Sequence, residues 1–170
     1  LGAWARALPA EKPERSQPVK DARGDWPWWR GPNHNGIAEI DQQPPVAWGP
    51  KQNIAWQTPV PGRGHSSPTV VGERIFLTTA DEDAKTQSVL CFQRQNGSLL
   101  WQREVNRGGF PRRIHRKNTH ASPTIAVANG RLFAVFYHHG GIQVAALDLN
   151  GKPLWNRNAG NFAPKKFEHG

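Results

Sequence analysis

The sequence predicts an all-β protein that is built from a repeated unit. The chain of 170 residues contains 17 glycines and 15 prolines, and no long run keeps the apolar spacing of a helix. Eight tryptophans stand against one tyrosine, which indicates a recurrent packing role for the indole ring. The segment that begins at His65 recurs at His120, an offset of 55 residues, and a fixed period of this length indicates a repeat architecture.

Each copy of the repeat divides into four short strands. The inner strand begins within the motif HSSPTVV in the first copy and HASPTIA in the second, and a turn that contains glycine leads from the strand into the next apolar run. Period-2 alternation and the turn residues then set the remaining boundaries. We expect strands at residues 67–71, 74–79, 88–93 and 99–104 in the first unit, and at 122–128, 131–137, 143–148 and 153–158 in the second.

Two Asn-Gly pairs predict the hairpins that join the third and fourth strands. Asn96-Gly97 and Asn150-Gly151 lie between apolar runs, and both residue types tolerate the positive φ of a type I′ turn. A unit of about 50 residues that folds as a four-stranded meander is typical of a β-propeller blade. The predicted fold class is therefore an all-β β-propeller, with about two four-stranded blades present, at about 65–104 and 120–158, of an expected total of roughly seven or eight.

Two segments precede the repeats. Residues 1–25 are rich in proline and charge, which indicates a disordered linker or the remnant of a signal peptide that ends near Ala5-Arg6-Ala7. The signal interpretation favours a periplasmic or secreted location. Residues 26–52 form a Trp-rich segment in which Trp26, Trp28 and Trp29 either pack against the domain or form a disordered aromatic recognition motif.

Residues 53–170 form the predicted partial β-propeller. Residues 53–58 are expected to form an isolated outermost strand that completes the last blade of a closed ring. Because two blades cannot close a ring that needs at least about four, we expect further C-terminal blades of the same chain as partners of this segment. No stretch approaches the roughly 20 apolar residues of a membrane span.

The hairpins resemble the tryptophan-docking motif of the pyrroloquinoline-quinone-like, or quinoprotein-type, β-propeller repeat family, whose pattern is Ala-x-Asp-x-x-Thr-Gly-Lys-x-x-Trp. The first copy keeps Gly97 and Trp101, and the second is one residue short but keeps five positions, Ala146, Asp148, Gly151, Lys152 and Trp155. The resemblance implies that Trp101 and Trp155 are structural wedges between adjacent blades, with Gly97 and Gly151 allowing the tight turn. Asp148 is expected to bind turn amides.

The resemblance leaves catalysis open and favours a non-catalytic protein. Family dehydrogenases hold pyrroloquinoline quinone (PQQ) and calcium at the axis with Glu, Asn and Asp residues and, in many, an adjacent Cys pair. This chain has one cysteine, Cys91, which lies in an apolar strand pattern and is read as a core residue. After Glu104 the only acidic residues are Asp148 and Glu168. No catalytic residue and no metal ligand is therefore assigned, and PQQ and calcium are expected only if other blades supply the site.

Candidate ligand-binding residues fall on the connections that lead into the inner strands. His65, His120 and His169 each precede such a segment, so we expect them on one face of the propeller near its axis. They form either a polar ring that contacts a ligand or a metal, or a capping device that recurs in every blade. The net charge of +9 belongs mainly to the second half of the chain.

The segment 107–117 carries five positive charges and no acidic residue, and Arg112, Arg113 and Arg116 are expected to supply charge for an anionic ligand on the same face. A solvated basic surface is the alternative. One basic run outside a recognised nucleic-acid-binding fold argues against nucleic acid. The leading hypothesis is a non-catalytic binding or scaffold propeller that presents one loop face to a protein or an anionic ligand, and the competing hypothesis is a PQQ-dependent dehydrogenase.

Overall fold

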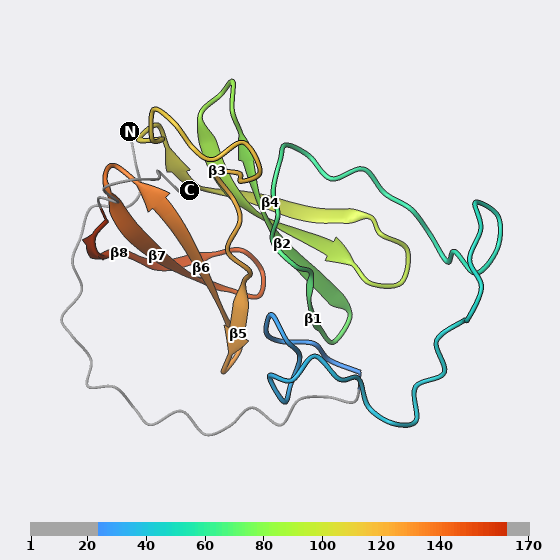
Figure 1. Ribbon diagram of the computed structural model, residues 1–170. Coiled ribbons are helices and arrows are strands. Elements are labelled where there is room, and N and C mark those ends of the chain that lie inside the picture. Colours follow the sequence, from blue (N-terminus) through green and yellow to red (C-terminus); the bar gives the residue numbers. More distant parts are fainter. Residues whose placement is uncertain (1–23, 163–170) are drawn as a thin grey trace.

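The computed structural model describes residues 24–162, and within them the chain folds into eight strands in two four-stranded antiparallel sheets (Figure 1). Blade 1 has the order β1-β2-β3-β4, with strands at Thr69–Val71, Arg74–Asp81, Thr86–Gln93 and Leu99–Arg107. Blade 2 has the order β5-β6-β7-β8, with strands at Ala126–Ala128, Arg131–His138, Gly141–Asp148 and Pro153–Asn161. The all-β fold of two four-stranded blades is confirmed.

The two blades repeat the same register. Cys91 of β3 lies between Phe76 and Trp101, and Ala146 of β7 lies between Phe133 and Trp155. The ring centroids of each aromatic pair are 6.0 Å apart. A single core fills the space between the sheets, with fully buried side chains from both blades, among them Phe76, Val89, Cys91, Ile125, Leu132, Phe136 and Leu147. Because the period-2 pattern places the same positions on the same faces, the repeat in sequence becomes a repeat in space.

The hairpin loops differ from the predicted type I′ turns. In blade 1 the amide of Gln93 donates to the carbonyl of Ser98 at 2.8 Å, and in blade 2 the amide of Asp148 donates to the carbonyl of Lys152 at 2.9 Å. Loops of four and three residues, 94–97 and 149–151, remain, and only their glycines have positive φ, 71° and 79°. Hairpin loops of this length are built on a type I turn that ends in a left-handed residue, so asparagine needs no positive φ. The loop that is one residue shorter explains the missing position in the second motif.

Asp148 binds the turn amides of its own hairpin, as the sequence predicts. Its carboxylate oxygen accepts from the amides of Asn150 at 2.8 Å and Lys152 at 2.9 Å. The first hairpin has Gln93 at this position and uses Asn96 instead, whose side-chain oxygen accepts from the amide of Ser98 at 2.9 Å. Each loop is thus held by one of its neighbouring side chains, Asn96 in blade 1 and Asp148 in blade 2.

The Trp-rich segment packs against the inner strands of both blades, beside β1 and β5 in Figure 1. The amide of Trp26 donates to the carbonyl of Val70 at 2.7 Å, and the amide of Val70 returns a bond of 3.0 Å. The amide of Val127 in β5 donates to the carbonyl of Pro27 at 3.2 Å. Trp26 therefore packs against the domain, whereas Trp29 is 67% exposed.

Residues 53–58 have no strand partner among residues 24–162. The chain leaves the Trp-rich segment as an extended arm and then returns to blade 1 (Figure 1), where Trp56 packs on Gly97. The expected outermost strand needs the last blade of a closed ring as its partner, so it stays a prediction. The 24–162 range includes no helix that is long and apolar enough to cross a membrane. Residues 1–23 and His169 lie outside the described residues.

Candidate functional site

Trp101 of blade 1 reaches across to the hairpin of blade 2. A Cβ added to Gly151 of blade 2 would lie 2.9 Å from the Trp101 ring of blade 1, so the ring lies directly on this glycine. Trp56 lies in the same way on Gly97, and its indole Nε1 donates to the carbonyl of Arg94 at 2.9 Å. Glycine is required at both positions because a side chain would displace the ring.

Two arginines reinforce the contact at Trp101. The guanidinium of Arg74 donates to the carbonyl of Leu149 and, at 2.9 Å, to the side-chain oxygen of Asn150. Nε of Arg103 donates to the carbonyl of Gly151 at 2.9 Å. Trp101 itself is half-buried, and its indole Nε1 is buried without a hydrogen-bond partner. The Leu149 carbonyl of blade 2 corresponds to the Arg94 carbonyl of blade 1, which accepts from the Trp56 indole. In blade 2 the donor to this carbonyl is the guanidinium of Arg74 instead of an indole.

The connections into the two inner strands lie side by side. The amide of His65 donates to the carbonyl of Ala121 at 3.0 Å, which joins the approach to β1 with the approach to β5. Arg63 bridges Ala80 at the end of β2 through two backbone hydrogen bonds of 2.8 and 2.9 Å. The structure therefore places His65 and His120 at one end of the two sheets, with His65 exposed and His120 half-buried.

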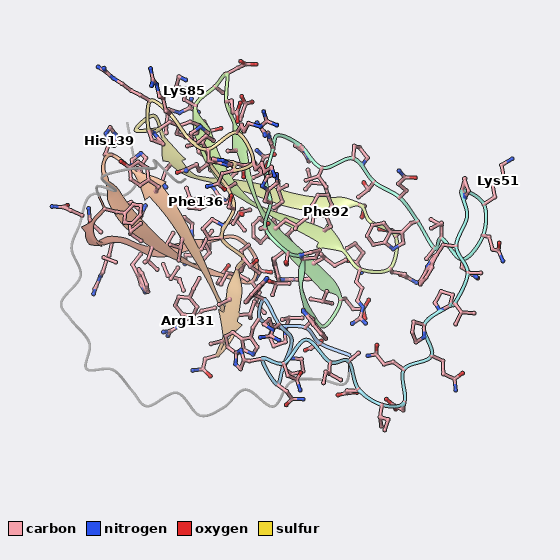
Figure 2. The ribbon with its side chains drawn as sticks, in the orientation of Figure 1. Lys51, Lys85, Phe92, Arg131, Phe136 and His139 are labelled. Atoms are coloured by element: carbon pink, nitrogen blue, oxygen red, sulfur yellow. The ribbon has the colours of Figure 1, made fainter. Side chains whose placement is uncertain are left out.

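The basic loop 107–117 is fixed to this end by contacts near its start. The amide of Gly108 donates to the carbonyl of Lys85 at 2.7 Å, and the carbonyl of Gly109 accepts from the amide of His139 at 2.9 Å. The Phe110 ring stacks on His120 with centroids 4.1 Å apart and an interplanar angle of 25°. Figure 2 labels Lys85 and His139 at this end of the molecule.

The arginines beyond Phe110 are exposed. Arg112, Arg113 and Arg116 have exposed side chains, and Lys117 extends the same positive surface. Arg107, which is also exposed, makes an ion pair with Glu104 at 2.5 Å. With an anchored start and an exposed basic centre, the loop concentrates positive charge at the end where His65 and His120 lie.

Burial lowers the pKa of His120. Desolvation is the largest cause that lowers the pKa of His120, Glu82 opposes the shift, and Lys85 and Arg63 add to it. Nδ1 of His120 is buried without a hydrogen-bond partner, because the Phe110 ring covers the imidazole. His120 is therefore a packing partner of Phe110.

The pair His138-His139 lies at the same end, with His138 half-buried and His139 exposed. Burial lowers the pKa of His138, although its Nε2 lies 3.3 Å from the carbonyl of Arg107, a hydrogen bond that favours the charged form. His139 further lowers the pKa of His138, and the two rings meet edge to face with centroids 4.4 Å apart. The β6–β7 turn is thus part of the support beneath the basic loop.

The family of the chain follows from its repeats. The family model described as outer membrane protein assembly factor BamB matches residues 46–166, a range that includes both blades, both hairpins and the basic loop. The chain belongs to this BamB-type family of PQQ-like repeats. No curated protein matches the sequence.

The PQQ-like repeats raise the question of whether the described residues offer donor groups for calcium and PQQ. Calcium takes six to eight oxygen ligands, mainly carboxylates and carbonyls. Residues 24–162 hold no group of three or more His, Cys, Asp or Glu side chains that is able to ligate a metal ion. Cys91 is buried in the core, where desolvation raises its pKa to about 11 although Arg74 acts in the opposite direction.

Sequence reasoning missed the buried polar links between the BamB-type blades. The amide nitrogen of Gln87 donates to the carbonyls of His120 at 2.7 Å and Tyr137 at 3.1 Å, and its oxygen accepts from Asn106 at 3.0 Å. Gln87 is fully buried and joins blade 1 to blade 2. The polar residues Thr86, Gln87 and Ser88, which directly precede an apolar run in the same strand, were the available signal. Arg74 and Arg103 were also missed, although arginine recurs at both positions in the second copy, as Arg131 and Arg157.

Proposed function

We propose that this chain is part of a non-catalytic β-propeller scaffold that binds an acidic segment of a partner protein through its loop end. The observation that carries the proposal is the contrast within the loop 107–117. Its glycines and Phe110 are anchored on both blades, whereas Arg112, Arg113 and Arg116 are exposed. Arginine forms paired hydrogen bonds with carboxylates, so an anchored row of this kind suits an acidic peptide.

The family description supports a scaffold role. It names an outer membrane protein assembly factor, which is a protein that acts through contacts with other proteins. The same description supports an exported location, periplasmic or secreted, for this chain. The loop end supplies exposed cations, and its half-buried His120 is covered by the Phe110 ring, so binding rather than proton transfer is the chemistry that it favours.

The test replaces Arg112, Arg113 and Arg116 together with glutamine and measures binding of a polyglutamate peptide. Exposed ion pairs contribute about 0.2–1 kcal/mol each, so the three changes should weaken binding about 10-fold at low salt. Affinity of the unchanged chain should fall steeply as ionic strength rises through about 0.1 M, where the screening length is about 10 Å. The melting temperature should stay nearly constant because these side chains are exposed.

A matched control carries the same charge change elsewhere. Arg30, Lys51 and Lys152 are exposed and lie outside the basic loop, so their joint replacement with glutamine tests net charge alone. Equal weakening by the two triple variants would show that the peptide responds to total charge rather than to this loop. Unfolding of the Arg112, Arg113 and Arg116 variant would show a structural role and would also end the proposal.

A further inference from the structure

Both ends of the basic loop 107–117 are bonded to one buried side chain, that of Gln87 in β3. The side-chain oxygen of Gln87 accepts from Nδ2 of Asn106, the residue directly before the loop, at 3.0 Å. Its side-chain nitrogen donates to the carbonyl of His120, shortly after the loop, at 2.7 Å. Gln87 therefore closes the base of the loop from the side of blade 1.

Gln87 has partners for its oxygen and for both of its N–H groups, although the side chain is fully buried. Its nitrogen also donates to the carbonyl of Tyr137 in β6 at 3.1 Å. Asn106 is buried as well, and its side-chain oxygen accepts from Nδ2 of Asn156 in β8 at 3.3 Å. Buried hydrogen bonds of this kind rigidify the groups that they join, so the base of the loop is held in one geometry.

The fold of a blade does not require this polar pair. In the register of blade 1, Gln87 of β3 lies opposite Asn106 of β4. The corresponding pair in blade 2 is Ile142 and Gly160, which have no polar side chain to form such a bond. Both blades nevertheless form the same four-stranded sheet. The two polar side chains therefore serve the connection from β4 to β5, which carries the basic loop.

The base of the loop is continuous with the contacts that anchor its first residues. His120, whose carbonyl Gln87 binds, carries the ring on which Phe110 stacks at a centroid distance of 4.1 Å. The amide of Gly108 donates at 2.7 Å to the carbonyl of Lys85, which lies just before Gln87 in the chain. A shift of the His120 backbone would therefore move the Phe110 ring and the exposed arginines that follow it.

We propose that Gln87 is a positioning residue for the acidic segment that binds this loop, an inference that rests on the proposed function. By bonding to both ends of the loop, Gln87 limits the arrangements of Arg112, Arg113 and Arg116 before the partner arrives. Binding then costs less conformational entropy, because the loop is already ordered. Since Gln87 is fully buried, it acts through the loop and does not contact the partner.

The test compares Gln87→Met with a control variant, Thr69→Val, in the full chain. Both substitutions nearly preserve the side-chain volume and remove a buried hydrogen bond that crosses from blade 1 toward β5. The hydroxyl of Thr69 donates to the carbonyl of Ile125 at 2.7 Å and is bonded to neither end of the loop. Both variants should be less stable, but only Gln87→Met should weaken binding of polyglutamate, by about 5-fold or more. Asn106→Ala, which keeps the bonds from Gln87 to blade 2, should weaken binding by about 2-fold.

Hydrogen exchange reports on the loop without the peptide. The amide of Gly108 donates to Lys85, and the amide of His139 donates to the carbonyl of Gly109, so both are protected by the anchored start of the loop. In Gln87→Met these two amides should exchange at least about 10-fold faster than in the control variant.

The His120 ring provides a second measurement of the same kind. If the loop loosens in Gln87→Met, the imidazole gains water, and its pKa, followed by NMR, should rise toward 6.5. Glu82, Lys85 and Arg63 are the charged groups that act on this ring, and the substitution changes none of them.

Unchanged exchange and an unchanged His120 titration in Gln87→Met would show that Gln87 does not hold the loop. Faster exchange with unchanged affinity, or an equal loss of affinity in Thr69→Val, would show a role in stability alone. Each of these results would overturn the inference and leave the proposed function standing. If Gln87→Met does not fold, Asn106→Ala is judged by the same measurements. Failure of the unchanged chain to bind polyglutamate would instead overturn the proposed function, and exchange and titration would still decide whether Gln87 holds the loop.

Discussion

Replacing Gly151 with alanine tests how closely the Trp101 ring packs on the hairpin of blade 2. Gly151 has a φ of +79°, and an added Cβ would lie 2.9 Å from two atoms of the Trp101 ring. The left-handed conformation costs a residue with a side chain about 1–2 kcal/mol. Displacing a packed ring adds about 1–3 kcal/mol. Gly151→Ala should therefore lower the free energy of unfolding by about 2–5 kcal/mol.

Gly130→Ala is the matched control for this substitution. Gly130 has a φ of +68°, and nothing lies within 4 Å of an added Cβ, so only the backbone cost of about 1–2 kcal/mol applies. Both variants can be compared by urea unfolding, followed by tryptophan fluorescence and far-UV circular dichroism, with the dependence on urea held as a check on the transition. Equal costs for the two alanines would refute the reasoning, because the ring would then contribute nothing at Gly151.

Three further outcomes are expected. Trp101→Ala should lower the free energy of unfolding, measured in urea, by about 3–5 kcal/mol. Trp155→Ala should lower it clearly less, because the hairpin of blade 2 covers Trp101 whereas no described residue covers Trp155 in the same way, and equal losses for the two variants would contradict this reason. Burial raises the pKa of the Cys91 thiol to about 11, so Cys91 should resist an aromatic disulfide reagent at pH 8 until urea is added, and rapid labelling of the native chain would contradict this. The stability that comes from the protonated thiol should be fully present below pH 9 and be lost as the pH rises through 11. Burial lowers the pKa of His120 from 6.5 in the folded chain, so its contribution to stability is present above pH 6.5 and is lost as the pH falls through the folded-state pKa. His120→Gln should therefore reduce the drop in the urea midpoint between pH 7 and pH 5. An unchanged drop would mean that other groups cause it.

The strand pattern was predictable because its signals are local. Alternation and turn residues located β2, β3 and β4 and their counterparts in blade 2 to within a few residues. The inner strands begin later than predicted, at Thr69 and Ala126, because the residues before them bond across the blades instead of along a ladder. The amide of Ser67 donates to the Thr124 hydroxyl at 3.0 Å, and the hydroxyl of Thr69 donates to the carbonyl of Ile125 at 2.7 Å.

The candidate site was predictable only at the level of topology. Connections from outer to inner strands emerge at one end of a blade, which is why His65 and His120 were expected together. The stacking of Phe110 on His120 depends on the path by which the loop 107–117 returns to the sheet, and the sequence of the loop does not specify that path. The bond between Arg74 and Asn150 joins residues 76 positions apart, and only the recurrence of arginine at the start of the second strand of each blade pointed to it.

The dipeptide Trp26-Pro27 also decides the order in which the fold is completed. Trp26 pairs with β1 and Pro27 accepts from β5, so the first described residues of the chain close the inner edges of both blades. A three-residue strand such as β1 gains little stability alone, and an unpaired edge invites pairing with other molecules. Val70 is made well before Val127, so Trp26 can cover the edge of β1 before Pro27 finds its donor in β5. At translation rates of about 5–20 residues per second, the inner edge of blade 1 is therefore closed seconds before that of blade 2.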